Sequence, residues 1–248
     1  MPIIDDLLAS LESDAPLREV RVCAFWTAVV LEDGRSGLAS TLRPEEPQCA
    51  GPAPLVPRAG HLLEYSALEL AQYAKSESLL EASIGMAATN ALIEIDESRC
   101  VELNAEQAIL ERGTGRKVAI VGHFPFISRV REVAEKLWVL EKRPAEGDLP
   151  AERAAEVLPQ ADVTAITGTS LINHTFEGLM KLCRPDALVI VLGPTTPLSP
   201  VLFDYGVDVI SGTKVVDVEV VLRCIGQGAS FKQVKGVQLL TMTKEKPT

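Results

Sequence analysis

Residues 117–128, KVAIVGHFPFIS, constrain the fold more than any other part of the chain. The apolar run 118–121 is β-branched in three of its four positions and stops at Gly122, and a short amphipathic segment follows at 127–133. Parallel strands buried on both faces have such continuous apolar runs. A strand that ends in glycine and leads into a helix is typical of the first crossover of a doubly wound α/β domain, where ligands bind outside the carboxyl ends of the strands. We therefore expect Gly122 to open a site.

Strands and helices alternate from Lys117 to the end of the chain. Apolar runs predict strands at 118–121, 136–140, 163–167, 187–192, 207–211 and 237–242. Helices are expected between them, centred near residues 131, 154, 178, 203 and 220. Such alternation predicts a Rossmann-like, doubly wound, mostly parallel sheet.

The N-terminal part has a different pattern. Residues 3–13 have apolar side chains at helical spacing, and 20–31 reads as one strand. Asp33 and Gly34 then form a strong hairpin signal, so a second strand is expected from near Ser36.

Further along, residues 42–60 hold five prolines and two glycines and predict an ordered surface loop. Helices follow, with cap residues that have Glu or Gln three positions later: Ser66, Ser78 and Asn104. We predict an α+β domain over residues 1–113, a hinge at 113–115 and a Rossmann-like domain over 114–248.

The predicted helix at 83–93, SIGMAATNALI, is dominated by small side chains on all its faces. Another backbone can approach such a helix closely, and a tightly packed interior helix is the simplest interpretation. Asn90 lies in its middle, where a buried amide needs hydrogen-bond partners. It is therefore a candidate for a side chain that faces a polar cleft.

Composition and charge narrow the range of partners. The formal charge of −10 disfavours nucleic-acid binding, which depends on Lys and Arg neutralising phosphates. The five cysteines are scattered, and neither a secretion leader nor an apolar run near 18 residues is present. We expect a cytoplasmic protein without membrane contact whose partners are small molecules or proteins. The oligomeric state stays open, and a homodimer is compatible with the sequence.

The candidate binding residues follow the ends of the predicted strands. In strand order they are Gly122, His123, Phe124 and Pro125; Glu141; Thr167, Gly168, Thr169, Ser170 and Asn173; and Gly193, Pro194, Thr195 and Thr196. The short hydroxyl and amide side chains beside glycines suit an anion or carboxylate held by backbone N–H groups, with plain helix capping as the alternative. Glu141 lies 19 residues after Gly122, where doubly wound folds often place an acid on a ribose hydroxyl, and a solvated charge is its alternative reading.

His123 directly follows the first strand and is the candidate acid or base, because imidazole titrates near neutral pH. A histidine hydrogen-bonded within a loop is the simpler alternative. No Gly-x-Gly-x-x-Gly follows this strand and Pro125 stiffens the loop, so tight NAD binding is not expected. S-adenosylmethionine needs no phosphate cradle and stays open. The three histidines lie far apart in the sequence, which predicts no protein-bound metal.

Four motifs occur together: SIGMAATNAL at 83–92, VGHFPF at 121–126, TGTSLINHT at 167–175 and GPTTPLSP at 193–200. In order and spacing the chain resembles the heavy-metal chelation proteins, a family first defined as a domain of unknown function. The resemblance covers essentially the whole chain. It implies an enolase-N-terminal-like α+β domain followed by a Rossmann-like domain, with the site in the cleft between them.

The resemblance also implies which residues form the cleft: Asn90 and residues 122–125, 167–173 and 193–196. Roles in chelating heavy metals, or in making or breaking pterin-, flavin- or siderophore-like molecules, have been suggested for such proteins. The chain departs from the idea of direct chelation because it has no His/Cys cluster. Two functions remain: an enzyme acting on a small, anionic, ring-containing metabolite, or a carrier that binds a metal–chelate complex without catalysis.

Overall fold

The computed structural model of the chain describes residues 2–44, 55–102 and 105–244. The predicted loop at 42–60 lies partly outside these residues, and the predicted cap Asn104 lies wholly outside them. The elements of the N-terminal part are α1 (Pro2–Ala9), β1 (Leu17–Val22), β2 (Trp26–Leu31), β3 (Ser36–Ser40), α2 (Ala67–Ala71), α3 (Leu79–Leu92) and β4 (Cys100–Val101). Those that follow are α4 (Ala105–Gly113), β5 (Lys117–Val121), α5 (Ile127–Val133), β6 (Lys136–Glu141), β7 (Leu149–Pro150), α6 (Ala154–Val157), β8 (Val163–Thr167), α7 (Thr169–Ile172), α8 (Phe176–Leu182), β9 (Leu188–Leu192), α9 (Val201–Asp204), β10 (Val209–Val215), α10 (Val218–Gly226) and β11 (Val237–Thr243).

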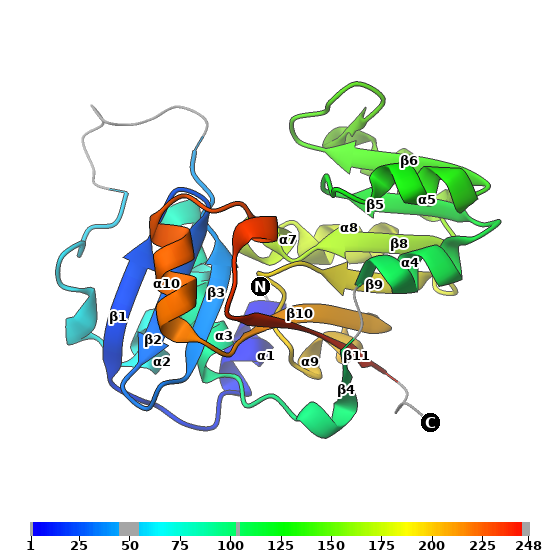
Figure 1. The fold of residues 1–248 in the computed structure, drawn as a ribbon. Coiled ribbons are helices and arrows are strands. Elements are labelled where there is room, and N and C mark those ends of the chain that lie inside the picture. Colours follow the sequence, from blue (N-terminus) through cyan, green and yellow to red (C-terminus); the bar gives the residue numbers. More distant parts are fainter. Residues whose placement is uncertain (1, 45–54, 103–104, 245–248) are drawn as a thin grey trace.

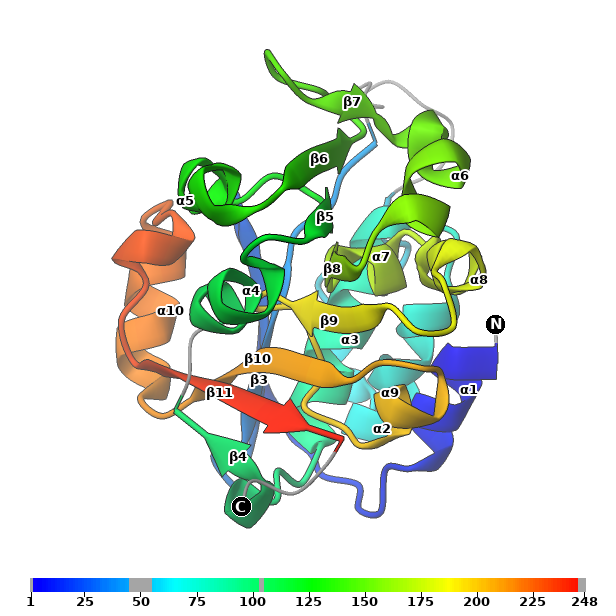
Figure 2. The same ribbon diagram turned by 90° about the vertical axis from the view of Figure 1, so that its right-hand side faces the viewer.

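Within the described residues, eight strands form one sheet in the order β4-β11-β10-β9-β8-β5-β6-β7 (Figure 2). The six strands from β10 to β7 are parallel, and β11 and β4 extend the sheet antiparallel. Numbered along the chain, the parallel strands follow the 3-2-1-4-5-6 order of Rossmann folds, with the switch point between β5 and β8. The predicted Rossmann-like sheet is confirmed.

Helices cover both faces of the large sheet (Figure 2). On one face α4 and α5 bury Ile109, Phe126 and Val130 against strand residues such as Ile120 and Val163. On the other face lie α1 and α7–α9. The central strands β5 and β9 are almost wholly apolar, as strands buried on both faces are, which is why their positions could be predicted from the sequence.

The small sheet has the order β1-β2-β3 and is antiparallel. The hairpin predicted at Asp33 and Gly34 joins β2 to β3, and Gly34 has a φ of 90° that the turn requires. The prediction of one strand over 20–31 was wrong, since two strands meet at a tight turn closed by a bond from Cys23 N to Trp26 O at 2.9 Å. The turn residues Ala24 and Phe25 carry no turn signal, so the apolar pattern continued through them.

Helix α3 packs on one face of the small sheet through backbone contact. A Cβ at Gly37 of β3 would lie 2.1 Å from the carbonyl oxygen of Ala87, and one at Gly85 would lie 1.9 Å from the nitrogen of Ala74. The helix is buried along almost its whole length. The expectation of a tightly packed interior helix that another backbone approaches is confirmed.

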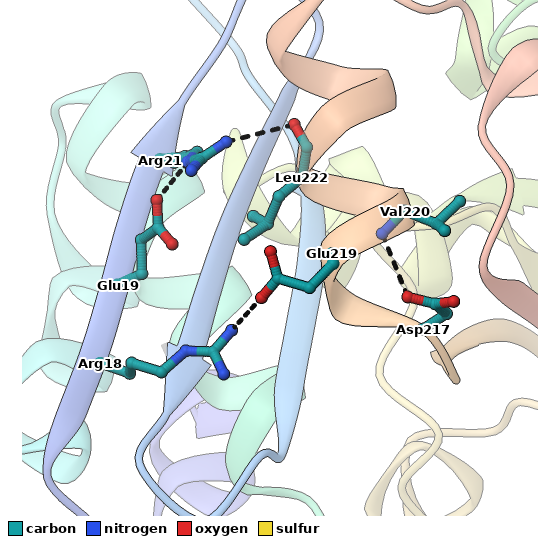
Figure 3. Close-up of polar contacts among 7 residues, drawn as sticks. All are labelled: Arg18, Glu19, Arg21, Asp217, Glu219, Val220 and Leu222. Atoms are coloured by element: carbon teal, nitrogen blue, oxygen red, sulfur yellow. Dashed lines mark hydrogen bonds and ion pairs between the residues drawn. The ribbon is translucent and has the colours of Figure 1, made fainter.

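Helix α10 covers the opposite face of the small sheet (Figure 1) although it follows β10 of the large sheet in sequence. Val221, Leu222 and Ile225 pack with Trp26 and Val30 of β2. Polar contacts at the edge join β1 to α10 (Figure 3), including Arg18 to Glu219 at 3.0 Å. The chain therefore returns to its N-terminal part before completing the large sheet.

One hydrophobic core runs between the two sheets and includes Val29 and Leu31 of β2 together with Ile166 of β8, Val191 of β9 and Ile210 of β10. Helix α4, which ends at the predicted hinge, packs against β8 and β9. The two-domain division at residue 113 stays a prediction. Among the helices that the structure describes, none combines the length and hydropathy needed to cross a bilayer.

Candidate functional site

A cavity of ≈ 480 Å³ lies at the carboxyl ends of β5, β6, β8 and β9, beside the switch point of the large sheet. The small sheet closes it through Trp26 and Ser40, and the connection between α10 and β11 adds Phe231 and Lys232. Parallel strands end at the same edge of a sheet, so residues far apart in the sequence meet there. We call it the main cavity.

The main cavity gathers almost all of the residues predicted from the strand ends. Those that line it are Gly122, His123, Phe124, Pro125, Glu141, Thr167, Gly168, Thr169, Ser170, Asn173, Gly193, Pro194 and Thr195. Asn90 and Thr196 lie behind the wall instead. The shape of the cavity thus depends on the four connections that the sequence singled out.

The hydroxyl groups after β8 bond mainly to their own segment. Ser170 Oγ donates to the carbonyl of Thr167 at 2.7 Å, and the hydroxyls of Thr167 and Thr169 lie 3.0 Å apart. Asn173 Oδ1 accepts from the hydroxyl of Thr175 at 2.6 Å. The N-cap of α7 is Gly168, which has no side chain, and the Thr167 hydroxyl accepts from Thr169 N at 3.4 Å, so capping engages only one of these residues.

Most backbone donors predicted to hold a ligand are already used. The N–H groups of Gly168 and Gly193 donate to Leu192 and Ser211, and that of Thr196 donates to Gly193. The first two acceptors belong to the neighbouring strands β9 and β10, so the hydrogen bonding of the sheet continues one residue beyond the ends of β8 and β9.

Other backbone donors around the cavity are unused. None of the hydrogen bonds in the described part of the chain uses the backbone N–H of His123, Phe124 or Thr195, all of which are cavity-lining residues. A backbone donor without a protein partner is satisfied by water or by a ligand acceptor. These three groups are therefore better candidates for holding an anion than the glycine donors.

The loop after β9 is held by the N-terminal part of the chain. Thr195 is buried, and its hydroxyl accepts from Ser40 N at 3.0 Å and donates to Ser40 Oγ at 3.0 Å. The amide of Asn90 donates to Leu38 O at 3.0 Å and to Thr195 O at 3.1 Å. Asn90 thus joins α3, β3 and this loop, and positions the cavity wall without lining the cavity.

Thr196 packs against the β8 connection. A Cβ at Gly168 would lie 2.5 Å from Thr196 Oγ1 and 2.7 Å from Thr196 N, so only glycine allows the two loops to approach this closely. The Thr196 hydroxyl is buried and has no partner among the described residues. Gly168 and Thr196 set the distance between two walls of the cavity.

His123 lies at the cavity with a carboxylate behind it. Its Nδ1 is 2.9 Å from Oδ2 of Asp148, whose side chain is 2% exposed, whereas the His123 side chain is 50% exposed. The same carboxylate oxygen accepts from Ala145 N at 3.0 Å. Sequence reasoning missed Asp148; its only signal was a Gly-Asp pair in the connection that follows the second predicted strand.

The charged side chains at the main cavity are few. Glu141 accepts its neighbour's N–H, that of Lys142, at 2.7 Å, and Lys142 and Lys232 are exposed at the rim. Across residues 2–44, 55–102 and 105–244, no three His, Cys, Asp or Glu side chains gather as a metal site. A second histidine, His174, follows β8, and its Nε2 bonds to Ala74 O at 3.1 Å, which gives it a structural role.

The fold and the cavity together define a Rossmann-like α/β protein to which a small antiparallel sheet has been added. A family model described as "Putative heavy-metal chelation" matches residues 104–244, and a second model with the same description matches residues 4–93. The first match spans more than half of the chain, so the chain belongs to this heavy-metal chelation family. The resemblance seen in the four sequence motifs is confirmed.

Three similar proteins have names that state no activity. An uncharacterized protein of Methanocaldococcus jannaschii is 29% identical over 177 residues, which are 68% of this chain and 68% of the relative. A crystal structure of a protein of unknown function from Desulfitobacterium hafniense, 28% identical, has a TM-score of 0.81 over 98% of this chain and 97% of that one. One from Pyrococcus horikoshii, 22% identical, has a TM-score of 0.78 over 97% and 98% and supports the fold alone.

Proposed function

We propose that the chain binds a small, anionic, ring-containing metabolite in the main cavity and moves a proton to or from it through His123. The observation that carries this proposal is the contact between His123 Nδ1 and the buried carboxylate of Asp148 at 2.9 Å. The cavity lies at the switch point of the sheet, where ligands bind in doubly wound folds.

The contact with Asp148 selects one tautomer of the neutral His123 imidazole. A carboxylate that already accepts the Ala145 N–H acts as an acceptor, so the imidazole Nδ1 carries the proton. In the neutral form of the ring, Nε2 then presents a lone pair, as a general base requires. A buried carboxylate that orients a histidine in this way is a common arrangement for proton transfer.

The rest of the cavity suits an anionic ring. Phe124, Trp26 and Phe231 supply aromatic surface, and Lys142 and Lys232 supply positive charge at the rim. The N–H groups of His123, Phe124 and Thr195 would take the anionic oxygens. Glu141 stays a candidate for a hydroxyl of the ligand, including a ribose hydroxyl if the ligand is S-adenosylmethionine.

A thermal-shift screen of pterins, flavins, nucleosides, S-adenosylmethionine and metal–chelate pairs identifies the ligand class. A cavity ligand at a hundredfold excess over its Kd stabilises the protein by about 2.7 kcal/mol, which gives a readily measured rise in Tm. If none of the ring-containing anions raises Tm, the proposal is contradicted.

Variants then test the proton transfer. His123→Ala and Asp148→Asn should abolish or strongly lower turnover of a hit while its binding survives. His61→Ala is the matched control, because His61 also contacts an acidic side chain, Glu64 at 2.7 Å, but does not line the main cavity. Turnover that persists in both cavity variants would show that His123 is not the acid or base.

The family description favours a second candidate, a carrier that binds a metal–chelate complex without catalysis. Here the metal arrives with its chelator, since no ligand cluster is present among the described residues. A metal–chelate pair should then raise Tm where neither the metal nor the chelator alone does, and no hit should be turned over.

The cytoplasmic location and the two-domain division at residue 113 are also proposals. The scattered cysteines support the first. The change from hairpins to strand–helix alternation supports the second. Limited proteolysis that yields a folded fragment beginning near residue 114 would support the division.

A further inference from the structure

A second cavity of ≈ 490 Å³ adjoins the main cavity and shares six lining residues with it, Phe124, Pro125, Gly193, Pro194, Phe231 and Lys232, which form a shared wall. Its remaining walls come from the start of α4, from α5, from β10 and from the segment between α10 and β11. We call it the side cavity. None of the residues predicted from the sequence points to it apart from those in the shared wall.

Aromatic and aliphatic groups dominate the side cavity. Phe124 and Phe126 are stacked with ring centroids 5.2 Å apart and an interplanar angle of 15°. Leu192, Val234 and Val237 add aliphatic surface. A flat or compact apolar body would therefore lose its contact with water here, which is the main source of affinity in such cavities.

The charges around the side cavity are mainly positive. Its charged residues are Glu106, Arg129, Lys232 and Lys235. Glu106 forms an ion pair with Arg129 at 2.5 Å. Neither Lys232 nor Lys235 has an ion pair among the described residues. The whole chain has 34 acidic and 24 basic side chains, so the excess of positive charge around the side cavity is opposite in sign to the net charge of the chain.

Thr213 of β10, which lines the side cavity, has a hydroxyl without a hydrogen-bond partner among the described residues. Its Oγ1 atom is buried, whereas the neighbouring Ser211 hydroxyl is bonded to Thr241 Oγ1 at 2.9 Å. A buried hydroxyl favours a ligand acceptor, because otherwise its hydrogen-bonding capacity is lost.

We infer that the side cavity is a separate binding site for a monoanion with an apolar ring, whose negative group lies near Lys232 and Lys235. The shared wall means that this ligand lies next to whatever occupies the main cavity. The inference does not rest on the proposed proton transfer, since no residue of the His123–Asp148 pair lines the side cavity.

The dye 8-anilinonaphthalene-1-sulfonate tests the site, because it is an aromatic monoanion whose fluorescence rises in apolar surroundings. Its uncharged analogue, N-phenyl-1-naphthylamine, has the same rings without the sulfonate. We expect saturable binding of the anionic dye to the folded protein. Lys235→Glu should weaken binding of the anionic dye at least about fivefold, because an attraction is lost and a repulsion is added. The same substitution should change binding of the uncharged analogue less than about twofold.

Lys181→Glu is the matched control, because Lys181 is also an exposed lysine but lines neither the side cavity nor the main cavity. It should leave the dye affinity within about twofold. Lys235→Gln, which removes the charge without adding a new one, should give an intermediate loss, and the Tm of each variant shows that it is folded. Equal losses in Lys235→Glu and Lys181→Glu, equal effects on both dyes, or no saturable binding would overturn the inference. The turnover tests at His123 are unaffected by any of these outcomes.

Discussion

The two faces of the small sheet are covered in different ways. On the α3 face, a Cβ at Gly37 would lie 2.1 Å from Ala87 O, so backbone touches backbone. On the α10 face, side chains such as Leu222 fill the space, and at the edge Arg18 and Glu219 form an ion pair with 38% and 76% exposure. Contact between backbones leaves no room for adjustment, whereas side chains can repack.

The difference matters for the main cavity. Asn90 on α3 fixes the loop after β9 through the Thr195 carbonyl, so the rigid face sets the cavity's geometry. The α10 face reaches the cavity through Lys232 and through Trp26 and Phe231, whose ring centroids are 5.4 Å apart. We expect the protein to be intolerant of change on the α3 face and tolerant on the rim of the α10 face.

The largest effect should come from Gly37→Ala. The added methyl meets backbone atoms of Ala87, Asn90 and Ala91, so α3 or β3 must move, at a cost of about 3 kcal/mol or more in the free energy of unfolding. Urea denaturation measures this. Gly178→Ala is the control, since nothing lies within 4 Å of its Cβ and the helix should gain up to about 1 kcal/mol. Similar results for both glycines would remove the distinction between the faces.

Asn90→Ala should be next, with a loss of about 2 kcal/mol, because the carbonyls of Leu38 and Thr195 lose their donor. Ligand affinity in the main cavity should fall with it, as the loop after β9 is freed. A loss below about 0.5 kcal/mol in urea denaturation would show that the bridge does not hold the loop.

Asp217→Ala should cost about 1 kcal/mol, because Asp217 caps α10 by accepting from Val220 N at 3.1 Å (Figure 3). Asp217→Asn keeps a side-chain oxygen at the cap and should be nearly neutral. If both substitutions cost the same, the charge and not the cap is what stabilises the helix.

The smallest effect should come from Arg18→Ala, below about 0.5 kcal/mol, because the pair with Glu219 is largely in water and is screened by salt. Denaturation curves at low and high salt should differ little between the variant and the parent. A loss above about 1 kcal/mol would mean that ion pairs hold α10 in place and would weaken the comparison.

The large sheet could be predicted because its strands are buried on both faces. Continuous apolar runs such as 118–121 and 188–192 mark such strands, and all six predicted strands are present within a few residues of their expected bounds. The turn between β1 and β2 was missed because Ala24 and Phe25 resemble strand residues. The destination of α10 could not be predicted either, since its apolar stripe fits any apolar face.

The sequence predicted those residues of the candidate site that directly follow the strands of the large sheet. Gly122, Thr167 and Gly193 meet because parallel strands end at one edge. Asp148, Trp26 and Phe231 belong to connections or to the other sheet, and only the three-dimensional path of the chain brings them to the cavity.

The return of α10 to the small sheet has a consequence for biosynthesis. Trp26 donates to Ala229 O at 3.0 Å, and these residues are 203 positions apart. At ordinary rates of translation, roughly 10 to 40 seconds separate their emergence from the ribosome. During that interval the apolar face formed by Trp26, Val30 and Leu38 lacks its cover, so the first sheet to be made is among the last parts to be completed.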